Sequence, residues 1–466
     1  MHENLEQTKP QGRPVSIQTL LRIVGPVFQR HWLRLLGGFI ALVVVDFLQL
    51  VIPRFVKTAV DSLSAQTATS GFLLRLSLSI CLIAVSVAGL RFAWRFLILG
   101  FSRILEKKLR DRFFDHILRM DQPFFERWTI GDLMAHASND LSTVQMACGM
   151  GLVAAVDALV MSAAALGFMM AISVKLTLIA LLPMPVLIVC TRILSGRLHY
   201  RFNLVQEQFS LLTEFARATL VSVRLIKAYT LEGFQEGGFQ RLGEAYVRSN
   251  LKVAAIQGLL FPIATLVGNV GMLLLLYYGG GLVIEHKITI GAFVAFTSYL
   301  YMLIWPMMAV GWVANMFQRG ITSLRRIHRV LEQRPVVVVG PTRPVPEKRG
   351  YTYVCRNLCF RYDGATRKAL DAIDLELGPG LVGMTGRTGS GKSTLCKLLL
   401  RMYPVADGML LFQGEDVNHL SQADIRQNIA YVSQDPLVFA DTIAANIAFG
   451  RPGATMEEIR AAARAA

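Results

Sequence analysis

The chain has 466 residues, of which 53% are apolar and only 17% are charged, a balance well outside that of soluble globular proteins. The formal net charge of +16 suggests nucleic acid at first, but the basic residues flank apolar stretches, where Lys and Arg set membrane orientation. The composition therefore argues against a soluble enzyme and against a nucleic-acid partner, and it predicts a chain that lies mostly in lipid.

The N-terminal region lacks the charged start, short apolar core and small-residue cleavage site of a signal peptide, so we expect the N-terminus to be cytoplasmic. Residues Ile17 to Arg34 carry apolar side chains at helical spacing with basic residues between them. This pattern predicts an amphipathic helix on the inner membrane surface.

Six apolar stretches are long enough to cross a membrane, because about 20 residues span the hydrocarbon core. They are Leu33 to Val56, Gly71 to about Gly100, Leu133 to about Ser173, Lys175 to about Leu194, Lys252 to Ile284, and Ile288 to Phe317. The helical pattern of the second stretch continues to Met120, and the fourth continues into a basic helix. At about 1.5 Å per residue, both helices project tens of ångströms beyond the lipid.

The connections between these helices differ in charge. The three short connections carry only Lys175 and Lys287, whereas the two long ones are rich in Lys and Arg, which predicts that the long ones are cytoplasmic. The tips of the long connections are expected at Phe124 to Trp128 and near Glu214 to Lys227. Six crossings place both ends of the chain inside.

A change of composition near Gln333 separates two domains. We predict a membrane domain at residues 1–332, a linker rich in Pro and Gly at 333–350, and a soluble domain at 351–466. Short alternating segments predict strands in the early soluble domain, and further strands are expected at Met409 to Phe412 and Ile429 to Ser433. A last helix is expected at Met456 to Ala466.

The six cysteines form neither CxxC pairs nor a disulfide framework, and no neighbouring histidines suggest a metal site. Cys355 and Cys359 are four residues apart in a predicted strand, so we expect them to share one of its faces.

The soluble domain contains a phosphate-binding pattern, GxxxxGK[ST], at Gly386 to Ser393. An apolar run, Leu381 to Thr385, precedes it and a helical pattern follows it, which predicts the order strand, loop, helix. In that context, backbone N–H groups surround an anion, Lys392 reaches the terminal phosphates and Ser393 holds Mg²⁺. The alternative is a glycine-rich turn without a ligand. The candidate loop residues are Gly386, Arg387, Thr388, Gly389, Ser390, Gly391, Lys392, Ser393 and Thr394.

Six long membrane helices followed by this loop resemble the ATP-binding cassette (ABC) exporter family over nearly the whole chain. Three segments, Asp46 to Pro53, Leu182 to Val186 and Ile304 to Met307, look like those of the bacterial multidrug-resistance-like half-transporters. The resemblance implies a polytopic α-helical membrane domain followed by a partial α/β P-loop (RecA-like) nucleotide-binding domain. It also implies ATP and Mg²⁺ as cofactors.

The resemblance assigns further roles. Tyr362 matches the aromatic residue that stacks on adenine, although a tyrosine that merely closes a strand is the alternative. Gln434 matches the glutamine that contacts Mg²⁺ and the attacking water. The two inner tips correspond to the family's coupling helices, which sit in grooves of the nucleotide domains; the alternative is an exposed loop.

The family's hydrolysis machinery also needs an apolar strand ending in Asp, a following Glu, a switch His and an LSGGQ signature. None of these follows Gln434 in this sequence. We therefore expect the chain as given to hold ATP without completing hydrolysis-driven transport.

Two functions remain open at this point. The first is an ATP-driven efflux half-transporter of the inner (plasma) membrane, which pairs with a second copy or a similar partner and moves drugs, lipids or peptides. The second is a non-catalytic paralogue or regulatory subunit that pairs with a complete transporter. Asp46 and Asp157 lie at membrane depth, where a carboxylate is costly. Asp46 is a candidate for the cargo pathway, and packing against a polar neighbour is its alternative.

Overall fold

The computed structural model describes residues 17–337, 352–434 and 437–466. The chain divides into two compact units. The membrane unit comprises Met1–Leu118 and Ile130–Gln333, and the soluble unit comprises Arg119–Thr129 and Arg334–Ala466. Most of the predicted linker, residues 338–350, lies outside the described residues.

Within the described residues, six helical stretches are long and apolar enough to cross a membrane, as the sequence predicts. Helix α1 (Ile17–Arg30) precedes them and ends earlier than expected, because α2 begins at Trp32. The spans are α2 (Trp32–Ser64); α3 (Ser70–Trp94) with α4 (Gly100–Leu118); α6 (Ile130–Ala135), α7 (Leu141–Met146) and α8 (Leu152–Ile172); α9 (Val174–Leu181) and α10 (Met184–Val221); α12 (Glu232–Leu274) and α13 (Gly280–Ile284); and α14 (Ile290–Met302) with α15 (Ile304–Leu331).

Several spans contain a π-helical turn between two consecutive α-helical segments. These turns are Arg95–Leu99, His136–Asp140, Ala147–Gly151 and Leu275–Gly279. The chain stays helical through them, which keeps its backbone hydrogen bonds satisfied at membrane depth.

The π turn at His136–Asp140 holds a buried carboxylate. Asp140 accepts a 2.9 Å hydrogen bond from Nε of Arg326, and its carboxylate lies 2.6 Å from Nδ1 of His136. This contact joins the third span to α15.

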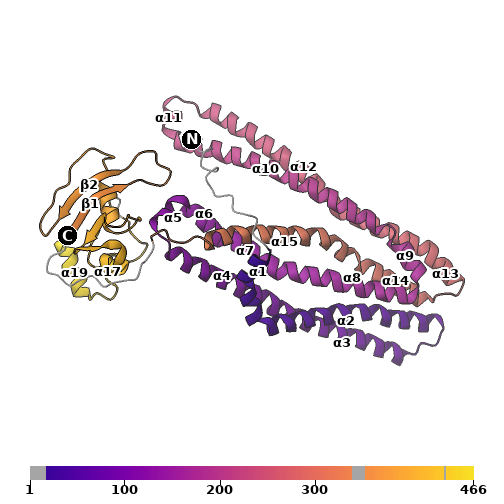
Figure 1. Cartoon of the computed structure of the whole chain (residues 1–466). Coiled ribbons are helices and arrows are strands. Elements are labelled where there is room, and N and C mark those ends of the chain that lie inside the picture. The colour runs from indigo at the N-terminus through magenta and orange to yellow at the C-terminus, as the bar shows by residue number, and fades with distance from the viewer. Residues whose placement is uncertain (1–16, 338–351, 435–436) are drawn as a thin grey trace. The chain divides into compact units, whose positions relative to one another are not determined.

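Helices α10 and α12 run side by side in opposite directions, joined by the short helix α11 (Val223–Ala228) (Figure 1). The turn lies within the range predicted for the second tip, near Glu214 to Lys227, but it begins later than the start of that range. Residues Glu214 to Val221 still belong to α10, and the chain turns at Ser222. The basic residues in this region gave no signal for the end of the helix, because Arg and Lys are good helix formers.

The core of the membrane unit lies where α2, α8 and α14 meet. The hydroxyl of Tyr299, which is 1% exposed, donates a 2.9 Å hydrogen bond to the carbonyl of Leu50. The Tyr299 ring stacks on Phe168 with centroids 5.5 Å apart. A buried tyrosine needs a partner for its hydroxyl, and here the partner is a backbone carbonyl of the first span.

The start of α14 is tied to the end of α2. The Asp61 carboxylate accepts hydrogen bonds from the Thr289 hydroxyl at 2.9 Å and from the Gly291 N–H at 2.8 Å. Anions are favourable at a helix N-terminus. A Cβ added at Gly291 would lie 2.3 Å from the carbonyl oxygen of Lys57, so this close approach of two helices requires glycine.

The described part of the soluble unit contains a four-stranded sheet in the order β2-β1-β3-β4, with each neighbouring pair antiparallel. The strands are β1 (Tyr353–Phe360), β2 (Leu370–Leu377), β3 (Leu410–Phe412) and β4 (Glu415–Asp416). The helices are α5 (Gln122–Arg127), α16 (Lys392–Leu399), α17 (Gln422–Gln427), α18 (Ile443–Ile447) and α19 (Met456–Ala465). One face of the sheet packs on Leu395 and Leu398 of α16 to form the core.

Two predicted strands are wrong. Leu381 to Thr385 and Ile429 to Ser433 are not strands, and Leu381 is fully exposed. Both segments are apolar, but none of the described residues pairs with either of them in a ladder. A strand without such a partner leaves its backbone groups unpaired, so apolar composition alone does not produce it.

The expected shared face of Cys355 and Cys359 is also wrong. The ladder between β1 and β2 shifts register between Cys355 and Leu358, where Asn357 adopts a φ of 48°. The extra residue reverses the alternation, so Cys355 and Leu358 are buried together. The Cys359 sulfur instead lies 3.3 Å from the backbone nitrogen of Ala372.

The close approach at Gly291 gives a direct stability test. We predict that Gly291→Ala lowers the apparent melting temperature of the detergent-purified protein by several degrees, because overpacking against the Lys57 carbonyl costs about 1–3 kcal/mol. Gly281→Ala is the matched control, since a Cβ there meets nothing within 4 Å. Equal melting temperatures for the two variants would show that α2 and α14 do not approach in this way.

Candidate nucleotide-binding site

The loop from Gly386 to Gly391 has a conformation that only glycine tolerates at three positions. Gly386, Gly389 and Gly391 have φ values of 157°, 81° and 93°. At Gly391 an added Cβ would also lie 2.5 Å from the Ala369 carbonyl oxygen. The pattern of glycines is thus explained by backbone geometry, which lets successive N–H groups face a common centre.

Lys392 is folded back over this loop. Its ammonium group donates to the carbonyl oxygens of Gly386 at 2.8 Å and Arg387 at 2.9 Å, and it lies 3.4 Å from the Ser390 hydroxyl. The loop residues from Gly386 to Ser390 are exposed. The cation is therefore held at the mouth of the loop by neutral acceptors, which a phosphate oxygen replaces with a stronger, charge-assisted bond.

Helix α16 begins directly after the loop, so its free N–H groups point toward the same place. Ser393 is exposed in the first turn, and Thr394 is buried. The remaining loop residues, Arg387 and Thr388, are exposed. Positive-φ glycines, a half-buried lysine and an open helix N-terminus together fit a chain of phosphates, and the role of Ser393 toward Mg²⁺ stays a prediction.

Tyr362 is brought to the same helix. Its hydroxyl lies 3.0 Å from the Thr394 hydroxyl oxygen, and its ring packs edge-on against Phe360 and Tyr403 with centroids 4.9 and 5.3 Å away. The ring is half-buried. The structure thus places Tyr362 beside the loop, while its role toward adenine stays a prediction.

Gln434 is not brought to the loop by any interaction of the described residues. It is exposed and lies in an irregular segment. Its proposed contact with Mg²⁺ and water therefore rests on the family resemblance alone.

The sequence did not reveal how α5 is held in the soluble unit. The Asp121 carboxylate accepts a 2.8 Å hydrogen bond from the Val337 N–H, and the Tyr403 hydroxyl donates to the Glu126 carboxylate. Burial, and then the bond to Glu126, raise the pKa of Tyr403 well above its ordinary range, so the hydroxyl remains a donor. Phe124 in the same helix is 2% exposed. Only the aromatic composition of this segment hinted at docking.

Asp46 is buried in the membrane unit, with 1% of its surface exposed. Its carboxyl group lies within hydrogen-bonding reach of the Asp157 carboxyl, and Arg91 is close enough to interact electrostatically. The second Asp46 oxygen has no hydrogen-bond partner among the described residues. Both alternatives for Asp46, packing against a polar neighbour and lining of a cargo pathway, stay predictions.

Comparisons with known proteins add to this geometry. The family described as "ABC transporter transmembrane region" matches residues 35–307, and the family described as "ABC transporter" matches residues 370–465. The multidrug resistance-like ATP-binding protein MdlA of Escherichia coli K12 is 40% identical over 94% of this chain and 74% of its own length. This chain belongs to the ABC transporter family.

Other similarities agree with this assignment. This chain is also 33% identical to YheI of Bacillus subtilis, a probable multidrug resistance ABC transporter ATP-binding/permease protein. The match covers 95% of this chain and 76% of YheI. A bacterial Atm1-family ABC exporter with ATP bound has the same fold, with a TM-score of 0.72 at 22% identity. That match covers 94% of this chain and 77% of the other. The fold is therefore that of an ABC exporter, a multi-pass membrane protein.

The position of Lys392 predicts its effect on nucleotide affinity. Lys392→Ala should weaken binding of a fluorescent ATP analogue to the purified transporter by about tenfold or more, because a charge-assisted hydrogen bond is worth about 1.5–3 kcal/mol. Lys397→Ala, in the last turn of the same helix, removes an equal charge away from the loop and serves as the control. Equal affinity of the two variants would exclude Lys392 as a phosphate ligand.

Proposed function

We propose that this ABC transporter is a half-transporter that uses ATP and Mg²⁺ to export apolar or amphipathic molecules. The single observation that carries the proposal is the presence of a glycine-built phosphate cradle and a six-span helical bundle in one chain. The similarity to MdlA and YheI, whose names refer to multidrug resistance, covers both parts. The proposed location is the inner (plasma) membrane, with the N-terminus and the nucleotide domain in the cytoplasm.

Each site residue has a proposed role. Lys392 exchanges the carbonyls of Gly386 and Arg387 for the terminal phosphates, and the N-terminus of α16 supports the same charge. Ser393 and Gln434 hold Mg²⁺, and Tyr362 stacks on adenine. Bound ATP supplies the free energy that favours closure of paired nucleotide domains.

The proposed partner is a second half-transporter, either another copy or a similar chain. In this proposal α5 and α11 transmit domain closure to the inner ends of the spans, as the family's coupling helices do. The hydrogen bonds of Asp121 and Glu126 support this role for α5, because they attach the segment between α4 and α6 to the soluble unit. Closure then changes the separation of the inner helix ends, and the cargo cavity that the two paired membrane domains enclose opens outward.

Transport by inverted membrane vesicles tests the proposal. Vesicles containing this chain extended by an LSGGQ signature, an Asp–Glu strand and a switch His should accumulate an amphipathic fluorescent dye when ATP and Mg²⁺ are added. Lys392→Ala in the extended chain should abolish this uptake, and Lys397→Ala should retain it. Vesicles containing the 466-residue chain alone should bind ATP without dye uptake. Dye uptake that is absent from the extended chain, or unchanged by Lys392→Ala, would contradict an ATP-driven exporter.

A further inference from the structure

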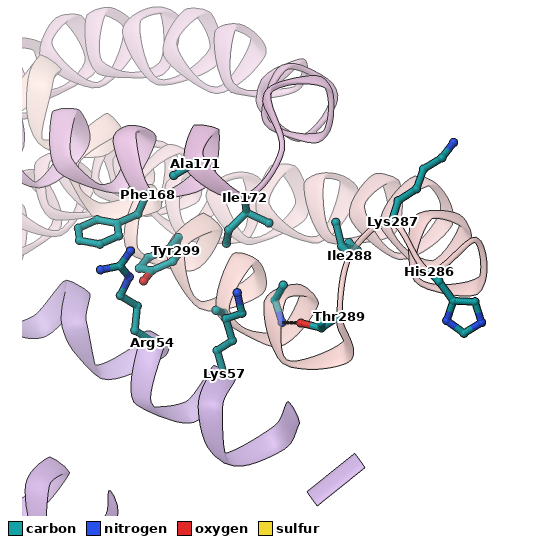
Figure 2. A pocket seen from close by; sticks show the side chains of 12 residues that line it. Arg54, Lys57, Phe168, Ala171, Ile172, His286, Lys287, Ile288, Thr289 and Tyr299 are labelled. Atoms are coloured by element: carbon teal, nitrogen blue, oxygen red, sulfur yellow. Dashed lines mark hydrogen bonds between the residues drawn. The ribbon is translucent and has the colours of Figure 1, made fainter. Parts of the chain in front are cut away.

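A cavity of about 300 Å³ lies between α2, α8, the connection from α13 to α14, and the start of α14 (Figure 2). It is located at the ends of the spans that are joined by short connections. Its wall is mixed: Phe168, Ile172 and Tyr299 provide an apolar and aromatic part, and basic side chains and Thr289 provide a polar part. Its charged lining residues are all basic: Arg54, Lys57, Lys287 and, when protonated, His286.

Two of these cations reach into the cavity. Figure 2 shows Arg54 and Lys57 extending from α2 toward Phe168 and Tyr299, whereas His286 and Lys287 point away from its centre. Lys287 is also paired with Glu285 at 2.7 Å. Arg54 and Lys57 are three residues apart, so they share a helix face.

The Arg54 guanidinium has a fixed position. It lies 5.0 Å from the centroid of the Phe168 ring, which in turn stacks on Tyr299. The hydrogen bond from Tyr299 to the Leu50 carbonyl locks this stack onto α2. The cation–π contact uses the face of the guanidinium and leaves its edge, with the N–H donors, available.

The two cations that reach into the cavity have no ion-pair partner in the part of the chain that the structure describes. Neither Arg54 nor Lys57 forms an ion pair with a carboxylate there. The nearby Asp61 carboxylate is engaged by the Thr289 hydroxyl and the Gly291 N–H. Two cations that lie side by side without an ion-pair partner repel each other, and a bound anion relieves this repulsion.

We propose that this cavity binds a phosphate-type anion attached to an apolar group, as in the headgroup region of an anionic lipid. Arg54 donates to the phosphate oxygens from the edge of its guanidinium, and Lys57 adds a second positive charge. Phe168, Ile172 and Tyr299 contact the adjoining hydrocarbon. The site lies in the membrane unit, whereas the nucleotide loop belongs to the soluble unit.

The test measures binding of phosphatidylglycerol and phosphatidylcholine to the purified full chain by native mass spectrometry. We expect the anionic lipid to be retained by the wild type, and Arg54→Gln and Lys57→Gln each to weaken its binding about tenfold. Arg75→Gln, an exposed cation in α3 near the same end of the spans, is the matched control and should bind normally. Arg54→Lys should recover part of the loss.

Competition by inorganic phosphate distinguishes the two sources of the anion. Weak competition that depends on Arg54 supports a lipid headgroup, and phosphate binding as tight as that of the lipid supports a soluble phosphate compound. Equal retention of phosphatidylglycerol by Arg54→Gln, Lys57→Gln and Arg75→Gln would overturn the proposal. If the first two variants fold poorly, the wild-type melting temperature decides: an equal rise with phosphatidylglycerol and phosphatidylcholine also overturns it.

Discussion

The attachment of α5 to the soluble unit is the contact on which the functional account depends. Its bonds involve groups of different kinds: a carboxylate accepts from the backbone at Val337, a buried tyrosine donates to Glu126, and Phe124 is buried. Helix α5 continues through short connections into α4 and α6, which belong to spans of the membrane unit. In the proposed function, a movement of the soluble unit on nucleotide binding reaches the membrane helices through these covalent connections and polar contacts.

The membrane helices could be predicted from sequence because lipid imposes a simple constraint. Every backbone group must be paired within its own helix, so long apolar segments have one stable conformation. The residues that fix how the helices pack against one another could not be predicted from the sequence. Gly291 and Asp61 are far apart in the chain, and nothing in their local sequence indicates that α2 and α14 meet there.

In the soluble unit, the candidate site could be predicted from the sequence and much of the sheet could not. The phosphate loop is a local structure, and its glycines, Lys392 and the following helix were predictable because adjacent residues build it. Strands depend on distant partners, so the apolar runs at Leu381 and Ile429 were misleading. The bulge at Asn357 likewise reversed the expected faces of β1. The partnership of Glu126 with Tyr403, 277 residues away, had no signal in a single sequence.

The most direct test of the account is the distance between the end of α4 that precedes α5 and the end of α10 that precedes α11, measured by pulsed electron paramagnetic resonance in membranes. Spin labels are placed at Leu118 and Leu220, which are 68% and 72% exposed, in a chain whose native cysteines are replaced. The account predicts that ATP and Mg²⁺ shift this distance in the wild type, and that Tyr403→Phe reduces the shift while nucleotide still binds. An unchanged distance in a wild-type chain that has bound ATP would contradict it.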